Sequence, residues 1–267
     1  MSIPAAIIGA SGYVGGELLR LVAGHPDFEL CAAVSDSAAG KPVGALFGHL
    51  GTALPQHQFV AHGDWLDCVE RGSNLALFSA APHGASAAML AEALENCEAR
   101  DIDAHIVDCS ADFRFAAQTA WEAIYKLEHG APQLLSQFLC AVPEHVSETS
   151  VPHVGHPGCF ATAMTLATVP LIRSGLAEAE VFISGVTGST GSGKTPIAGT
   201  HHPERNSNLY AYKPLSHRHA PEVESLVEAA TGRETRVHFV PHSGPFARGI
   251  HVTVQARTTS AVDVQAV

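Results

Sequence analysis

The chain has 267 residues, of which 46% are hydrophobic and 15% charged, and its formal net charge at pH 7 is −11. This length and apolar content suffice for two ordinary domains with hydrophobic cores, and the negative charge argues against a nucleic-acid partner. No stretch approaches the roughly 18 apolar residues of a membrane span, and the first residues lack a signal-peptide pattern. The six cysteines have no paired spacing, which favours a reducing, cytoplasmic environment. The 17 histidines show no metal-site spacing, so we expect no metal.

The N-terminal segment predicts a dinucleotide-binding turn. An apolar run over residues 3–8 predicts a buried strand, and a helix is expected at 17–23. Between them lies Gly9-Ala-Ser-Gly-Tyr-Val-Gly15. Glycine permits a tight turn and a close approach to a pyrophosphate, whose charge is favoured at a helix N-terminus. A second strand at 29–34 completes the context that distinguishes such a site from an ordinary glycine turn.

The end of the second strand bears on the choice of nucleotide. Asp36 lies where an acidic residue would bind a ribose 2′-hydroxyl and favour NAD. Its neighbours Ser35 and Ser37 would instead accommodate a 2′-phosphate. The residues alone leave this choice open.

Strands and helices continue to alternate, which predicts a parallel sheet. Strands are expected at 75–78 and 106–108, with a helix at 85–100 between them. Arg114 follows a strand's carboxyl end, where open α/β sheets bind ligands, although a surface arginine would also fit. We interpret residues 121–139 as a surface excursion. The polar, turn-rich stretch near residue 150 suggests two domains, 1–152 and 153–267.

Cys159 stands where a turn meets a helix. Pro157-Gly158 predicts a sharp turn and residues 160–172 a helix, which we expect Pro170 to kink or end early. A thiolate at a helix N-terminus is stabilised by unpaired N–H groups and by the helix dipole. The alternative is a small buried cysteine that closes the turn.

Residues 188–195 match the pattern of a nucleotide-triphosphate P-loop, G-x-x-x-x-G-K-T, after a strand expected at 180–186. A true P-loop opens a helix, whereas the residues that follow contain glycine and proline and no helical period. A glycine-rich loop against a phosphate or a nicotinamide is the interpretation we prefer.

The remaining residues predict an α+β arrangement. A short helix is expected at 222–230, with His217 and His219 in irregular chain just before it. Strands are expected at 237–240 and 249–256.

Taken in order, six motifs resemble those of one family. They are Gly9-Ala-Ser-Gly-Tyr-Val-Gly15, Pro82-His83-Gly84, Asp108-Cys-Ser-Ala-Asp-Phe-Arg114, His156-Pro-Gly-Cys159, Thr187-Gly-Ser-Thr-Gly191 and His217-Arg-His-Ala-Pro-Glu222. From residue 3 to its end the chain resembles the N-acetyl-gamma-glutamyl-phosphate reductases of arginine biosynthesis, which are related to aspartate-semialdehyde dehydrogenase.

The resemblance implies a Rossmann-type parallel-sheet domain followed by an α+β catalytic and dimerisation domain. It implies NADPH-dependent reduction of an acyl phosphate, N-acetyl-glutamyl 5-phosphate, to the semialdehyde through a cysteinyl thioester. A homodimer or homotetramer is also implied.

The resemblance further implies roles for individual residues. Cys159 would be the nucleophile, His219 the acid/base and His217 the alternative acid/base. The expected cofactor contacts are Gly9, Ser11, Gly12, Tyr13, Val14, Ser35, Pro82, Gly188 and Ser189. The expected substrate contacts are Arg114, for the phosphate, with Arg205 and Glu222.

Three features depart from the family pattern. His156 stands where the family usually has asparagine, and Asp36 is awkward beside a 2′-phosphate. Residues 259–267 resemble the start of a C-terminal helix that returns to the nucleotide domain in the family, so we expect a shortened chain with weakened or no activity. Three alternatives are a reductase of an aminoadipyl-type acyl phosphate of lysine biosynthesis, a P-loop NTPase and a non-catalytic dinucleotide-binding regulator.

Overall fold

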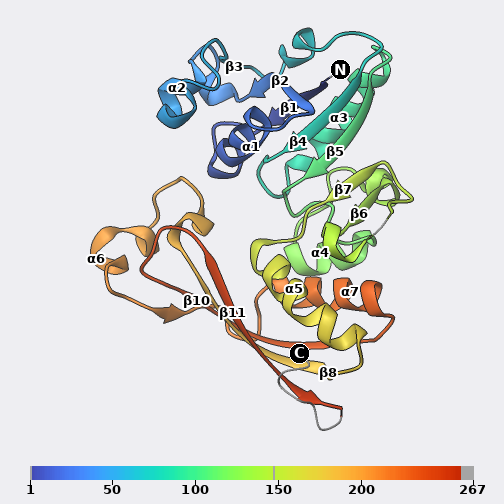
Figure 1. Cartoon of the computed structure of the whole chain (residues 1–267), viewed down its shortest axis with the longest axis vertical. Helices are drawn as coiled ribbons and strands as arrows, with labels where there is room; N and C mark the ends of the chain where they lie inside the picture. The colour runs from blue at the N-terminus through green and yellow to red at the C-terminus, as the bar shows by residue number, and fades with distance from the viewer. Residues whose placement is uncertain (1, 147, 260–267) are drawn as a thin grey trace. The chain divides into compact units, whose positions relative to one another are not determined.

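The computed structural model describes residues 2–146 and 148–259, which form two compact units (Figure 1). Unit 1 runs to Cys140 and includes Thr149–His156, and unit 2 includes Ala141–Glu148 and continues from Pro157. The functional division after residue 152 stays a prediction. The expected shortening of the C-terminal segment falls on residues 260–267, outside the described part. In the described part, no helix is long and apolar enough to span a membrane.

Unit 1 is built on a seven-stranded sheet in the order β3-β2-β1-β4-β5-β7-β6, with every neighbouring pair parallel. The strands are β1 (Ile3–Ile8), β2 (Phe28–Val34), β3 (Phe59–Val60), β4 (Asn74–Ser79), β5 (Asp103–Asp108), β6 (Phe138–Cys140) and β7 (His153–Gly155). The strand order reverses at β1, so ligands are expected at the carboxyl ends of β1 and its neighbours. The predicted Rossmann-type parallel sheet is confirmed.

Helices cover both faces of this sheet because its strands are apolar on both sides. Ala5 and Ile7 of β1 belong to one buried cluster with α1 (Tyr13–Ala23). Ala6 and Ile8 belong to the other, with α3 (Ser86–Glu98). Successive side chains of a strand point to opposite faces, so α1 and α3 pack on opposite sides. The short α2 (Val43–Leu46) joins the α1 side.

The interpretation of residues 121–139 as a surface excursion is wrong. Trp121, in α4 (Gln118–Tyr125), is fully buried, and its indole N–H donates to the carbonyl of Ala111 at 2.9 Å. Its ring also packs edge-on against His129. Ala131, Leu134, Leu135 and Phe138 of the same stretch are also buried, in the cluster that contains α3.

Unit 2 pairs a four-stranded sheet, in the order β11-β8-β10-β9, with two helices. Its elements are α5 (Cys159–Arg173), β8 (Ala177–Thr187), α6 (His202–Arg205), β9 (Tyr210–Ala211), α7 (His219–Thr231), β10 (Arg236–Ser243) and β11 (Ile250–Thr258). β8 and β10 are parallel, and the outer strands β9 and β11 are antiparallel to their neighbours. One buried cluster joins α5 and α7 to the sheet, which agrees with the α+β prediction.

The helix expected at 160–172 is α5, and one of the two effects expected of Pro170, an early end, does not occur. α5 continues to Arg173, with Ser174 donating its hydroxyl to the Pro170 carbonyl at 2.8 Å. Proline in a last turn removes few helical hydrogen bonds, so it is tolerated there. α7 begins at His219, which places this histidine inside the first turn rather than ahead of the helix.

Candidate active site

The turn between β1 and α1 brings the backbone to the reversal point of the sheet. Gly9 has a φ of +75°, and a Cβ there would lie 2.5 Å from the carbonyl oxygen of Ala80, so this position requires glycine. A Cβ at Gly15 would also meet the carbonyl of Gly9. α1 starts at Tyr13, and Gly12 at its N-cap supplies no side-chain cap. The first N–H groups of a helix have no acceptor within it, so this turn suits a phosphate.

The end of β2 presents hydroxyl groups to the same turn. The Ser35 hydroxyl donates to the Ser11 hydroxyl at 2.7 Å and lies 3.3 Å from that of Ser37. The Asp36 carboxylate accepts the backbone N–H of His62 at 2.7 Å. The carboxylate is therefore engaged by the protein's own backbone, while neutral hydroxyls stand beside the glycine turn. This arrangement is compatible with a 2′-phosphate.

The N-terminus of α3 is already bound by a carboxylate of the protein itself. The Asp112 carboxylate accepts the N–H groups of Gly84 at 2.7 Å and of Ala87 at 3.0 Å, at the start of α3. Pro82, at the carboxyl end of β4, remains exposed beside this capped turn. Because a carboxylate already occupies the α3 N-terminus, α1 is the better anion site of the two.

A buried polar network holds the chain between β5 and Arg114. Asp108 is fully buried and accepts hydrogen bonds from the hydroxyls of Ser110 at 2.5 Å and Ser86 at 2.8 Å. Burial raises the pKa of this carboxyl group. The Asp108 carbonyl also accepts the N–H of His156 at 2.7 Å, which ties β5 to the end of β7.

Arg114 is nearly buried, with 5% of its surface exposed. Its Nε donates to the carbonyl of His156 at 3.2 Å and one terminal nitrogen donates to that of Cys109 at 3.3 Å. The Cys109 thiol has its pKa raised to about 11, mainly by burial, so it is a poor nucleophile. The guanidinium group is thus fixed by backbone carbonyls at the carboxyl edge of the sheet.

Cys159 is the first residue of α5, and its side chain is exposed. The preceding N–H, that of Gly158, donates to Glu222 Oε1 at 2.6 Å. Glu222 is fully buried in the first turn of α7. A buried carboxylate on one helix therefore fixes the turn that presents the thiol on another. Full burial also makes Glu222 better suited to positioning this turn than to touching substrate.

Two histidines pack beside this turn. Nδ1 of His217 accepts the backbone N–H of His219 at 3.2 Å, and the two rings lie 4.6 Å apart. Both rings contact Phe160, which follows the cysteine. Burial, reinforced by Arg218 and Lys213, lowers the pKa of His217 to about 4. His217 is therefore neutral at neutral pH and carries its proton on Nε2.

The hydrogen bonds of the loop's backbone N–H groups argue against the P-loop alternative. Three of them donate to carbonyls of a second loop: Gly188 to Gly249 at 3.0 Å, Ser189 to Phe246 at 2.9 Å and Thr190 to Ala247 at 3.0 Å. A short 3₁₀ turn, Ser189–Ser192, follows instead of an α-helix. These groups are unavailable to cradle a triphosphate, and glycine at 188 is needed because a Cβ would lie 2.6 Å from the Ala247 carbonyl.

Arg205 is 8% exposed and lies at the end of α6. Its terminal nitrogens donate to the Ser243 hydroxyl at 2.5 Å and to the Gly244 carbonyl. These bonds tie α6 to the end of β10, and the expected substrate contact at Arg205 stays a prediction.

Known families match both halves of the chain. A family model described as semialdehyde dehydrogenase, NAD binding domain, matches residues 4–149, and one described as semialdehyde dehydrogenase, dimerisation domain, matches 159–267. An N-acetyl-gamma-glutamyl-phosphate reductase of Methanopyrus kandleri is 38% identical over 253 residues, which are 92% of this chain and 69% of that protein. The one from Ectopseudomonas mendocina is 35% identical over 268 residues, or 99% of this chain and 75% of that protein. The chain belongs to the N-acetyl-gamma-glutamyl-phosphate reductase family.

Solved structures agree on the fold of this reductase family member. Aspartate semialdehyde dehydrogenase II of Vibrio cholerae superposes with a TM-score of 0.69 at 13% identity, covering 100% of this chain and 77% of that one. The aspartate semialdehyde dehydrogenase of Candida albicans, solved with NADP, has a TM-score of 0.60 at 14% identity and covers 98% and 73%. At these identities the likeness concerns the fold alone.

Sequence reasoning about this reductase family member missed Tyr212. Its ring packs edge-on against His217, with the centroids 5.7 Å apart, and against the core of unit 2. Its pKa is raised to about 12, first by burial and then by the charge of Cys159. A tyrosine just after a two-residue strand carries no motif, and only the position of its ring distinguishes it from Tyr210.

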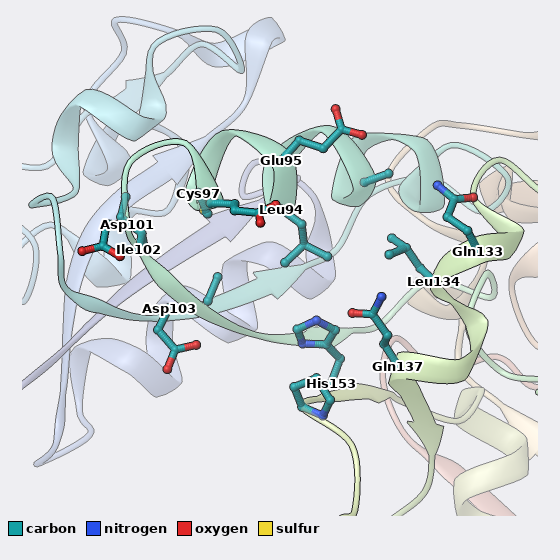
Figure 2. Close-up of a pocket in the computed structure, with 14 residues that line it drawn as sticks. Leu94, Glu95, Cys97, Asp101, Ile102, Asp103, Gln133, Leu134, Gln137 and His153 are labelled. Carbon is teal, nitrogen blue, oxygen red and sulfur yellow. The ribbon is translucent and has the colours of Figure 1, made fainter.

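A cavity of about 520 Å³ lies elsewhere in unit 1, along α3, the start of β5 and the 3₁₀ turn Pro132–Gln137. Figure 2 shows acidic side chains around it, among them Glu95, Asp101 and Asp103. Asp103 begins β5, so this cavity is at the amino end of the strand, opposite the end that carries Arg114. It is therefore separate from the candidate active-site residues of unit 1.

Proposed function

We propose that the chain reduces N-acetyl-gamma-glutamyl phosphate to the semialdehyde, with release of phosphate and at the expense of NADPH, as a step of arginine biosynthesis. The observation that carries this proposal is the setting of Cys159. Cys159 is the first residue of α5, the turn before it is fixed by buried Glu222, and His219 packs against Phe160, the residue after it.

The first half of the reaction transfers the acyl group to sulfur. The Cys159 thiolate attacks the acyl carbon, and the bond between that carbon and the phosphate oxygen breaks, so that phosphate leaves with the electron pair. Arg114 neutralises the phosphate charge through charge-assisted hydrogen bonds. The product on the enzyme is a thioester.

The second half returns the sulfur to its starting state. NADPH, when bound, supplies the hydride that reduces the thioester carbonyl. The carbon–sulfur bond then breaks, the aldehyde leaves and Cys159 is regenerated. We assign proton transfer at the sulfur to His219, because His217, whose pKa is about 4, is neutral at neutral pH and uses Nδ1 to hold the His219 backbone.

NADPH fits the turn between β1 and α1. The required glycine at Gly9 and the uncapped helix start at Tyr13 support pyrophosphate binding there, together with Ser11, Gly12 and Val14. Ser35 supports the 2′-phosphate, since the carboxylate of Asp36 is engaged elsewhere. We keep Pro82, Gly188 and Ser189 as further proposed cofactor contacts.

We further propose a homodimer or homotetramer, formed through the face of the unit 2 sheet opposite α5 and α7. Phe182 of β8 is 48% exposed on that face and stacks on His238 of β10. The match of residues 159–267 to a semialdehyde dehydrogenase dimerisation domain supports this proposal. We place the enzyme in the cytoplasm, because a reducing compartment keeps the exposed Cys159 as a thiol.

The reverse reaction tests the proposal. N-acetylglutamate semialdehyde, inorganic phosphate and NADP are mixed with the protein, and the nicotinamide absorbance is followed. We expect cofactor reduction only when both semialdehyde and phosphate are present. Reduction that does not need phosphate, or that survives Cys159→Ser, would contradict it.

Parallel assays separate the alternatives. Faster turnover of an aminoadipate-type semialdehyde would favour the lysine-pathway reductase. ATP hydrolysis abolished by Lys194→Ala would favour the P-loop NTPase, and cofactor binding without any turnover would favour the regulator.

A further inference from the structure

Arg114 ends a short turn whose backbone is fixed by several other segments of unit 1. The Arg114 N–H donates to the Ala111 carbonyl at 3.4 Å, and the same carbonyl accepts the indole N–H of Trp121 at 2.9 Å. Asp112, inside the turn, uses its carboxylate to bind backbone N–H groups at the start of α3. The direction of the Arg114 side chain therefore depends on the backbone of the two or three residues before it.

His129 fixes the middle of this turn. Its side chain is buried, with 3% of the residue exposed, and its Nε2 lies 2.7 Å from the carbonyl oxygen of Asp112. Nδ1 accepts the backbone N–H of Ala131 at 3.1 Å, so the ring proton is on Nε2, which donates it to the Asp112 carbonyl. The ring also packs edge-on against Phe113 and Trp121, at centroid distances of 5.6 and 4.9 Å. Its position and its tautomer are both determined by these contacts.

We propose that His129 is a positioning residue for the phosphate of the substrate, because its hydrogen bond to the Asp112 carbonyl fixes the turn that directs the Arg114 guanidinium group. The inference rests on the proposed function, in which Arg114 binds this phosphate, and it adds a residue outside the six family motifs. Without the imidazole N–H, a buried carbonyl loses its donor and the turn can relax. A displaced guanidinium group then forms weaker charge-assisted hydrogen bonds to phosphate.

The test measures phosphate binding directly. Inorganic phosphate is titrated into the protein in a calorimeter, with NADP at saturation so that the turn before α1 is occupied. Arg114→Ala defines the part of the binding that depends on the arginine. His129→Gln and His129→Asn are then compared, because the amide nitrogen of glutamine lies as far along the side chain as Nε2, whereas that of asparagine matches Nδ1. Only the glutamine variant retains a donor for the Asp112 carbonyl.

We expect phosphate affinity to fall about tenfold in His129→Asn and to be largely restored in His129→Gln, with NADP affinity unchanged in both. In the reverse reaction, the KM for phosphate should rise in His129→Asn while that for the semialdehyde stays the same. Equal phosphate affinity in the two variants overturns the proposal, and so does the absence of phosphate binding by the unaltered chain. A parallel loss of NADP affinity would show a general structural role and would also overturn it.

His57→Asn is the matched control. The Nε2 of His57 also bonds to a backbone carbonyl, that of Leu30 at 3.2 Å, but in β2, which two strands separate from β5. We expect a lower Tm and unchanged phosphate affinity, and a loss of phosphate affinity equal to that of His129→Asn would contradict the inference. Failure of the proposed function has a different signature, since turnover would then survive Cys159→Ser, or Arg114→Ala would leave phosphate affinity unchanged.

Discussion

The two units hold their candidate groups in different ways. In unit 1 the proposed nucleotide site consists largely of backbone, with the helix start at Tyr13 and the close approach at Gly9. In unit 2 the proposed reaction centre consists of side chains from separate segments, fixed by burial, such as Glu222 and His217. A site formed by backbone groups can be recognised in the sequence by its glycines. A site formed by packed side chains from separate segments has no comparable sequence pattern.

The two glycine-rich loops sharpen this contrast. Both match nucleotide-binding patterns, but an α-helix begins within the loop at 9–15. In the loop at 188–193, three backbone N–H groups instead donate hydrogen bonds to carbonyls of residues 246–249. We therefore expect glycine to permit anion binding in the first loop, whereas in the second it permits close packing of two chain segments. The acceptors of the backbone N–H groups therefore distinguish a nucleotide-binding glycine pattern from one that serves chain packing.

The largest effect is expected at the nucleophile. Cys159→Ser should lower turnover by about a thousandfold or more, because the weaker hydroxyl nucleophile replaces the thiolate. NADPH binding, measured by nucleotide fluorescence, should persist because that site belongs to unit 1. Cys109→Ser is the control, because the Cys109 thiol is already unreactive. A comparable loss of turnover in this variant would show that the loss is not specific to Cys159.

Gly9→Ala tests the backbone site. The new Cβ would lie 2.5 Å from the Ala80 carbonyl in a left-handed conformation, so NADPH affinity should fall about tenfold or more, with a lower Tm. Gly40→Ala has a similar φ of +78° but open space around it, and should cost only about 1 kcal/mol of stability. Equal effects of the two would show that strain, and not the approach to Ala80, matters at Gly9.

Glu222→Ala tests the side-chain site. Its loss leaves the buried Gly158 N–H without its acceptor, which should cost about 1–3 kcal/mol of stability. It should also lower kcat more than it raises KM, because the turn before Cys159 loosens. Glu222→Gln keeps an acceptor oxygen and should restore most of the activity.

Glu224→Ala is the matched control on the same helix. Its carboxylate also accepts a backbone N–H, that of Val237, at 2.9 Å, but away from the cysteine. Stability should fall while kcat holds. A fall in kcat equal to that of Glu222→Ala would assign the effect to α7 as a whole.

A smaller effect is expected from pH. His217 is neutral when folded, because its pKa is lowered to about 4 from the ordinary 6.5, and it becomes protonated more readily when unfolded. Its contribution to stability is therefore complete above pH 6.5 and is lost as the pH falls to 4, by about 1–2 kcal/mol after allowance for solvent screening. The Tm of His217→Phe should fall less steeply over this range, and an identical slope would refute this origin.

Much of the fold could be predicted from local patterns. Apolar runs at 3–8 and 75–78 and the glycine turn between strand and helix indicated a parallel sheet, because burial on both faces demands continuous apolar strands. The burial of Trp121 and the start of α7 at His219 could not be predicted. The indole of Trp121 bonds to Ala111, ten residues earlier, and His219 packs against Phe160 on another helix, so neither follows from the local pattern.

The sequence by itself determined the family, the order of motifs and the residue types available for chemistry, since each follows from neighbouring residues. Only the tertiary structure decided that Asp112 binds the N-terminus of α3 while the N-cap of α1 has no side-chain hydrogen bond, and that Glu222 reaches Gly158. Hydrogen bonds act over a few ångströms of space, and residues 25 to 64 positions apart, as in these bonds, meet at such distances only after the chain has folded.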